Sequence, residues 1–93
     1  MIWAILESRQ AKKEIDRLPP QVLRKYQFWL GMMQTQGPEA VRHFPGFKDE
    51  ALKGEWKGCR SARLNIQYRV VYRIEKLVVT VFVERVDPHT YRK

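Results

Sequence analysis

Apolar positions in the first part of the chain follow the spacing of a strand and then of a helix. The short apolar run at residues 2–6 predicts a strand, and Ser8 behind it can cap a first helical turn. Ala11, Ile15 and Leu18 then recur at helical spacing, with charged residues on the other faces. The "LPP" that follows predicts the end of this helix at Leu18, because a proline disfavours helical angles in the residue before it.

A second helix is predicted from Pro20, a residue suited to a first helical turn, to the "QGP" at Gly37. Phe28 and Met32 lie beside its apolar stripe, where they either widen the edge of the core or form a landing site for a partner. The stripe is the strongest repeat in the chain and predicts the face that packs on the core. It consists of Val22, Tyr26, Trp29, Leu30 and Met33.

Residues 38–58 lose this periodicity and contain three glycines and two prolines among charged residues. At most a short helical turn is predicted there, at Glu39–His43. A connection of this length is unusual inside a compact domain, so we suspect a functional role for it. His43, in "VRHFPGF", is interpreted as a loop-packing residue rather than a catalyst.

The pattern changes to a β period after Gly58. In "RSARLNI", Ala62, Leu64 and Ile66 alternate with polar residues, and "YRVVYRI" continues the alternation. The nearly continuous apolar run of "KLVVTVFVERV" is typical of a central strand with both faces covered. A short connection at Glu75–Lys76 predicts an antiparallel hairpin between the last two strands.

Together these elements predict one α+β domain over residues 1–93, with the order β-α-α-β-β-β. An N-terminal strand is followed by a two-helix hairpin, and the hairpin packs on one face of an antiparallel sheet. A chain of this length has room for a single hydrophobic core, so a second domain is not expected.

Composition adds a strong positive charge to this picture. The formal net charge of +8 comes from 18 Lys and Arg against 10 Asp and Glu, which favours an anionic partner and above all nucleic acid. Cys59 is the only cysteine, so it is interpreted as a small half-buried residue and not as part of a disulfide or metal site. No run approaches the roughly 20 apolar residues that cross a bilayer. The N-terminus also lacks a signal-peptide pattern, and we expect a cytoplasmic protein without a membrane partner.

Candidate chemistry lies on the polar face of the predicted sheet and behind its last strand. Arg63 and Arg69 alternate onto the same face of neighbouring strands, where they either bind phosphate or are solvated. In the ending "VDPHTYRK", His89 has a side chain that titrates near neutral pH, and Tyr91 can stack on a base or donate a proton.

These side chains suit cleavage of RNA through its own 2′-hydroxyl, which requires a base, an acid and positive charge but no metal. Glu50 can supply a carboxylate. The sequence contains no zinc, nucleotide-loop or serine-hydrolase motif, and no cofactor is expected. Further positive charge for binding RNA comes from Lys53, Lys57, Arg60, Arg73 and Arg92.

The stretch "ALKGEWKGCRSARLNIQYRVVYRI" resembles the part of the chain that typifies the RelE/ParE toxin superfamily. "KKEIDRLPPQV" is similar to the helical hairpin of these toxins, and "VDPHTYRK" resembles the His-x-Tyr ending of RelE-, HigB- and YoeB-like members. The resemblance implies the toxin of a bacterial type II toxin–antitoxin system, a metal-independent mRNA endonuclease that acts on the ribosome. It implies a cognate antitoxin and mRNA in the ribosomal A site as partners, and operator DNA only through the antitoxin.

The resemblance also implies roles for individual residues. Arg69, in "YRVVY", matches the catalytic arginine of the family, and Arg63 matches a second basic residue on the preceding strand. His89 and Tyr91 match the C-terminal positions for acid–base catalysis and for stacking on a base.

The general base is less narrowly defined, and so is the function. Glu50, three residues before Lys53, resembles the base of the YoeB-like branch, with Asp49 and Glu55 as neighbouring alternatives. A ParE-like inhibitor of DNA gyrase and a non-catalytic basic RNA-binding module remain alternative functions. The His/Tyr pair of the tail favours the nuclease, because a gyrase inhibitor needs neither residue and an RNA-binding module needs aromatic residues but not His89.

Overall fold

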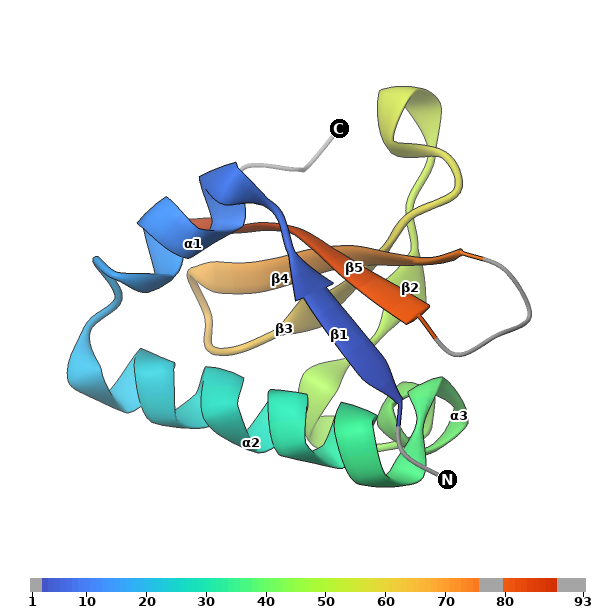
Figure 1. Cartoon of the computed structure of the whole chain (residues 1–93), viewed down its shortest axis with the longest axis horizontal. Helices are drawn as coiled ribbons and strands as arrows, with labels where there is room; N and C mark the ends of the chain where they lie inside the picture. Colours follow the sequence, from blue (N-terminus) through green and yellow to red (C-terminus); the bar gives the residue numbers. More distant parts are fainter. Residues whose placement is uncertain (1–2, 76–79, 89–93) are drawn as a thin grey trace.

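The chain forms one mixed sheet with its long helix on one side (Figure 1). The structure is a computed structural model, and it describes residues 3–75 and 80–88, with Val83 as the only described side chain of the second range. The sheet has five strands in the order β1-β5-β4-β3-β2. The elements are β1 (Ala4–Glu7), α1 (Arg9–Ile15), α2 (Pro20–Gln36), α3 (Pro38–Arg42), the 3₁₀ helix η1 (Pro45–Phe47), β2 (Glu50–Ala51), the 3₁₀ helix η2 (Gly54–Trp56), β3 (Arg60–Arg63), β4 (Tyr68–Glu75) and β5 (Thr80–Pro88).

The predicted α+β fold is confirmed, with two additions to the sheet. Strands β3, β4 and β5 form the expected antiparallel meander, and β5 has a central position in the sheet. The first addition is that β1 pairs with β5 in parallel. The second is β2, which pairs antiparallel with β3 at the other edge. The connection predicted at Glu75–Lys76 leads into residues 76–79, outside the described residues.

The two predicted helices are present, and their ends follow local chemistry. The Ser8 hydroxyl accepts a hydrogen bond from the Ala11 amide at 3.0 Å, as predicted for a cap. Helix α1 ends at Ile15 rather than at the predicted Leu18. The chain tightens there, because the amides of Arg17 and Leu18 bond to carbonyls three residues back, at Glu14 and Ile15.

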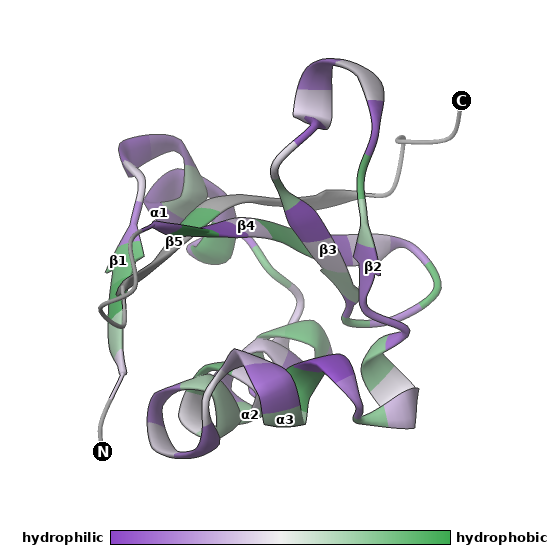
Figure 2. Cartoon of the chain, turned by 90° about the vertical axis from the view of Figure 1, so that its right-hand side faces the viewer, coloured by the Kyte–Doolittle hydropathy of each residue, from purple (hydrophilic) through white to green (hydrophobic). Residues whose placement is uncertain are grey.

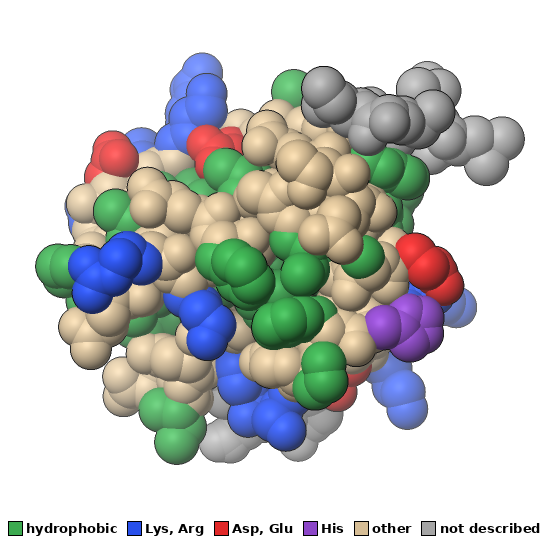
Figure 3. Space-filling view, turned by 90° about the horizontal axis from the view of Figure 1, so that it is seen from below, with side chains coloured by type: hydrophobic (Ala, Val, Ile, Leu, Met, Phe, Trp, Pro, Cys, Tyr) green, Lys and Arg blue, Asp and Glu red, His purple; other side chains and the backbone are tan. Residues whose placement is uncertain are grey.

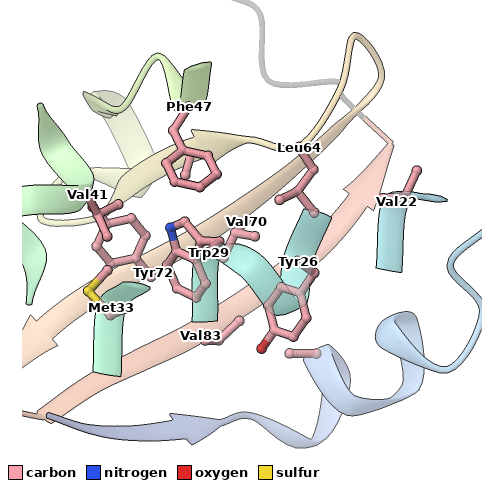
Figure 4. Packing of buried hydrophobic residues seen from close by; sticks show 12 residues of the cluster. Val22, Tyr26, Trp29, Met33, Val41, Phe47, Leu64, Val70, Tyr72 and Val83 are labelled. Carbon is pink, nitrogen blue, oxygen red and sulfur yellow. The ribbon is translucent and has the colours of Figure 1, made fainter. Parts of the chain in front are cut away.

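The apolar stripe of α2 forms the centre of the core (Figure 4). Tyr26, Trp29 and Met33 are fully or almost fully buried. The Trp29 ring meets the edge of Tyr72 from β4, with centroids 5.4 Å apart. This aromatic contact joins the helix to the middle of the sheet, so Tyr72 identifies the face of β4 that is covered by α2.

Gly37 ends α2 in a conformation that only glycine adopts readily, with φ at 90°. A Cβ atom there would lie 2.7 Å from Nε1 of Trp3, whose amide bonds to the Gln34 carbonyl. We therefore expect Gly37→Ala to lower the free energy of unfolding by about 2–4 kcal/mol, measured by urea denaturation. Gly31→Ala is the matched control, because nothing lies within 4 Å of its added Cβ. An unchanged Gly37→Ala midpoint would contradict this account.

The segment at residues 38–58 is almost continuously structured. The helical turn predicted at Glu39–His43 is present as α3, and only the prediction of an irregular remainder was wrong. The segment contains α3, η1, β2 and η2. Its first part packs on α2 through a cluster of aromatic rings. The ring centroid of Phe28 lies 5.6 Å from that of Phe44 and 5.9 Å from that of Phe47. Phe28 thus covers the edge of the core while leaving 48% of its surface exposed. Seen from the α2 side, hydrophobic side chains gather near the middle of this face (Figure 3).

Two further predictions concern single residues. Ile66 was expected to continue the strand face of Ala62 and Leu64, but it is 83% exposed, because β3 ends at Arg63 and residues 64–67 form the turn to β4. The Asn65 side chain holds this turn by accepting hydrogen bonds from the amides of Gln67 and Tyr68. Cys59 is buried, and so more deeply placed than the half-buried position predicted for it.

The second part of the segment lies on the other side of the sheet. The chain around η2 rises from the face opposite α2 and α3, and its tip is hydrophilic (Figure 2). Among the described residues, no helix combines the length and the apolarity needed to cross a bilayer.

Candidate active site

A guanidinium and a carboxylate meet on the sheet face that points away from α2. Arg69 of β4 lies directly across from Arg63 of β3 in the strand register, as the alternation predicted. Because neighbouring residues on a strand face opposite sides, Ser61, Arg63 and Arg69 share the side opposite Tyr72. The Arg69 Nη1 atom lies 3.3 Å from Oε2 of Glu50 and 3.2 Å from the Ser61 hydroxyl.

Arg69 is not a solvated surface cation, which was one of the two alternatives that the sequence left open. Only 9% of its surface is exposed. Glu50 keeps 59% of its side chain exposed. The pair therefore combines a fixed cation with a carboxylate that solvent or a ligand can reach.

Strand β2 is the element that brings Glu50 to Arg69. It pairs with β3 over only two residues, with Glu50 opposite Ser61 and Ala51 opposite Arg60. The Leu52 amide extends the ladder by bonding to the Cys59 carbonyl at 3.0 Å. Glu50 is thus fixed relative to Arg69 through one intermediate strand, although the two residues are 19 positions apart.

A second polar cluster lies at the β2 edge of the sheet, but on the side that faces the core. The side chain of Asp49 is completely buried, and its Oδ1 lies 2.6 Å from Nε of Arg60. The Tyr72 hydroxyl donates a hydrogen bond to the other carboxylate oxygen. The sequence suggested Asp49 only as an alternative base, since nothing local marks a single loop aspartate as buried. Its position between two charged or polar partners is decided by the sheet.

This cluster and a similar one around Tyr26 change the acidity of two phenols. Burial, and then the charge and hydrogen bond of Asp49, raise the pKa of Tyr72 far above its usual value. Burial and the hydrogen bond to Glu7, 2.5 Å away, do the same to the pKa of Tyr26. Burial alone would lower the pKa of Arg60, but the bond to Asp49 outweighs it and the pKa is raised.

The raised phenol pKa values predict how stability depends on alkaline pH. A phenol with a raised pKa stays protonated in the folded chain while it ionises near about pH 10 in the unfolded chain. The free energy of unfolding should therefore be insensitive to these groups below that pH and should fall as pH rises above it. Urea denaturation from pH 8 to 11 checks this, and Tyr72→Phe should flatten the decline. A stability that increases above pH 10 would contradict it.

The remaining residues singled out in the sequence lie in different surroundings. Lys53 and Lys57 flank η2 on the projecting segment and are exposed. Arg73 is partly exposed, and its Nε lies 2.8 Å from Oε2 of Glu75. Arg60 is bonded to Asp49 on the core side of the sheet. His43 is exposed, and its ring bonds to the Glu39 carbonyl at the end of α3 rather than packing in a loop. Three residues lie outside the described part of the chain: His89, Tyr91 and Arg92.

The arrangement offers acid–base and electrostatic chemistry. No group of three or more His, Cys, Asp or Glu side chains able to hold a metal ion occurs in the described ranges. What residues 49–69 do assemble is a fixed guanidinium, a hydroxyl and an accessible carboxylate. Such a set can bind an oxyanion and accept a proton beside it.

Comparison with known proteins identifies the fold. No protein-family model matches the sequence, and no curated protein matches it significantly. Solved structures do match. An archaeal RelE–RelB complex from Pyrococcus horikoshii aligns with a TM-score of 0.76 and 20% identity over 99% of this chain and 100% of the other. The DinJ–YafQ toxin–antitoxin complex of Escherichia coli gives 0.75 and 20%, over 96% and 94%.

A YoeB–YefM toxin–antitoxin complex from Staphylococcus aureus gives a TM-score of 0.73 and 20% identity, over 97% of this chain and 100% of the other. At such identities the likeness establishes the fold. The chain therefore has the fold of the RelE, YoeB and YafQ toxins, which confirms at the level of structure the resemblance seen in the sequence.

Proposed function

We propose that this chain is the toxin of a type II toxin–antitoxin pair and that it cuts mRNA on the ribosome. The observation that carries the proposal is the contact of Arg69 with Glu50 on the sheet face away from α2, in a fold shared with RelE, YoeB and YafQ. The net charge of +8 supports an RNA substrate, because phosphates supply the matching negative charge.

The proposed reaction is transesterification at a phosphodiester. Glu50 removes the proton of the 2′-hydroxyl, and O2′ forms a bond to the adjacent phosphorus. The bond from phosphorus to the 5′ oxygen breaks, and His89 protonates that oxygen, which leaves a 2′,3′-cyclic phosphate. Arg69 and Arg63 stabilise the charge on the non-bridging oxygens, a contribution of roughly 3–4 kcal/mol per positioned donor. No metal ion takes part in this scheme.

We assign binding of the RNA to cations of the segment around η2 and of β4, together with residues of the C-terminal tail. Lys53 and Lys57, on the exposed segment around η2, are proposed to contact phosphates of mRNA or ribosomal RNA. Arg73 and Arg92 are proposed to add to this surface, and Tyr91 to stack on a base next to the cut. Arg60 is proposed to contribute only long-range positive charge, because its Nε is bonded to the Asp49 carboxylate.

The proposed partner that controls this activity is a cognate antitoxin. The similar chains from P. horikoshii, E. coli and S. aureus were each solved in a complex, two of them described as toxin–antitoxin complexes. A surface with this net charge favours an acidic or amphipathic antitoxin. Contact with operator DNA would be made through that antitoxin, and the site of action would be the cytoplasm.

Induced expression without an antitoxin tests the function. We expect growth arrest, and primer extension on ribosome-bound mRNA should show new 5′ ends within codons at the A site. Growth arrest with loss of DNA supercoiling and intact mRNA would replace the proposal with gyrase inhibition. RNA binding without any cleavage would replace it with a non-catalytic RNA-binding module.

A further inference from the structure

Asp49 and Glu50 are adjacent carboxylates with opposite surroundings. Asp49 is completely buried on the core side of the sheet, whereas Glu50 is 59% exposed beside Arg69. We propose that Asp49 is a positioning residue, which holds β2 against the sheet so that Glu50 stays within reach of Arg69. The role of Glu50 in cleavage rests on the proposed function, whereas the role of Asp49 in holding β2 against the sheet does not.

The alternation of a strand couples the two side chains. Successive residues of a strand point to opposite faces, so a fixed orientation for Asp49 below the sheet dictates the side on which Glu50 emerges. A shift of β2 by one residue would exchange the two and place Glu50 in the core. Burial of the Asp49 carboxylate therefore sets the register of β2 that keeps Glu50 exposed.

Strand β2 needs a contact of this kind to fix its register because it is very short. The strand has two residues, and it lies at the edge of the sheet with β3 as its neighbour. Both of its residues are exposed, so apolar burial does not hold it in place. The Glu50 side chain is a weak anchor as well, because its carboxylate is 59% exposed and stays largely hydrated beside Arg69.

Asp49 supplies the missing anchor through two different strands. Arg60 belongs to β3 and Tyr72 to β4, and the two are direct partners in the register. Each donates to a different oxygen of the Asp49 carboxylate. One side chain thus ties the start of β2 to both strands that carry Ser61 and Arg69. A carboxylate accepts from both donors at once, whereas an amide in the same position has only one accepting oxygen.

Hydrogen exchange tests the structural part without any reference to catalysis. In Asp49→Asn we expect the Leu52 amide, which bonds to Cys59 across β2 and β3, to exchange at least about tenfold faster. The Leu64 amide, bonded to Tyr68 at the far end of β3, should stay unchanged. Tyr72→Phe keeps the ion pair to Arg60 and should show a smaller effect, which covers the case that Asp49→Asn unfolds. Asp16→Asn makes the same change at an exposed residue and should alter neither amide.

Cleavage rates test whether Asp49 acts through Glu50. We expect Asp49→Asn to slow single-turnover cleavage of ribosome-bound mRNA by about 10- to 100-fold, as misplacement of a reacting group does. Combined with Glu50→Gln, it should cost nothing beyond Glu50→Gln alone. Effects that multiply, or a Leu52 amide that stays protected in both Asp49→Asn and Tyr72→Phe, would overturn the inference. A wild-type chain that does not cut RNA would overturn the proposed function, and the exchange data alone would then decide the role of Asp49.

Discussion

Arg69→Ala is expected to reduce cleavage of ribosome-bound mRNA by about 100- to 1,000-fold, the usual cost of losing one positioned donor to a transition-state oxyanion. Arg69 is held by the Glu50 carboxylate and the Ser61 hydroxyl, so its guanidinium is in place before substrate arrives. A donor that needs no reorganisation stabilises developing charge most effectively. The rate is measured in a single turnover, with purified ribosomes and a short mRNA.

The same variant should remain folded, although Arg69 is buried. Its partner Glu50 is mostly exposed, so water can solvate the carboxylate that the change leaves behind. Circular dichroism and a thermal melt check the fold, and Arg17→Ala, at an exposed arginine after α1, is the matched control. Cleavage at the wild-type rate would remove Arg69 from the mechanism. A variant without a cooperative melt would show that Arg69 is a structural residue.

His89→Gln is expected to slow cleavage by about 100- to 10,000-fold while leaving RNA affinity nearly unchanged. A proton donor acts in the transition state, so its loss lowers the rate far more than it weakens ground-state binding. His43→Gln is the matched control, because the chain has two histidines and His43 bonds only within α3 in the described structure. Equal losses of rate and affinity in His89→Gln would make His89 a contact residue and not the acid.

The local parts of the fold were predictable from the sequence because their causes are local. The stripe containing Tyr26, Trp29 and Met33 predicted a buried helix face, and these residues are buried. The alternation around Arg63 and Arg69 predicted a shared face, and the register places them opposite each other. Periods of 3.6 and 2 residues are written into a few successive positions, so neighbouring residues suffice to reveal them.

The errors have equally physical causes. Strand β2 has two residues, too few for any alternation, and its pairing depends on β3. Ile66 continued an apolar alternation past the point where the Asn65 turn ends the strand. The burial of Arg69 was missed because the exposure of a strand residue depends on what covers that face of the sheet. Its contact with Glu50 was equally hidden, since the two residues are 19 positions apart.

The sequence by itself determined the two main helices and the strands of the meander, the helix face that forms the core, the strand face that carries the arginines, and the positive charge that favours an RNA partner. Only the tertiary structure decided which carboxylate meets Arg69 and which one is buried. Asp49 and Glu50 are adjacent and chemically alike, so local sequence cannot tell them apart. Their surroundings differ once β2 pairs with the sheet. Asp49 then points to the side with Tyr72 and the core, and Glu50 points to the side with Arg69.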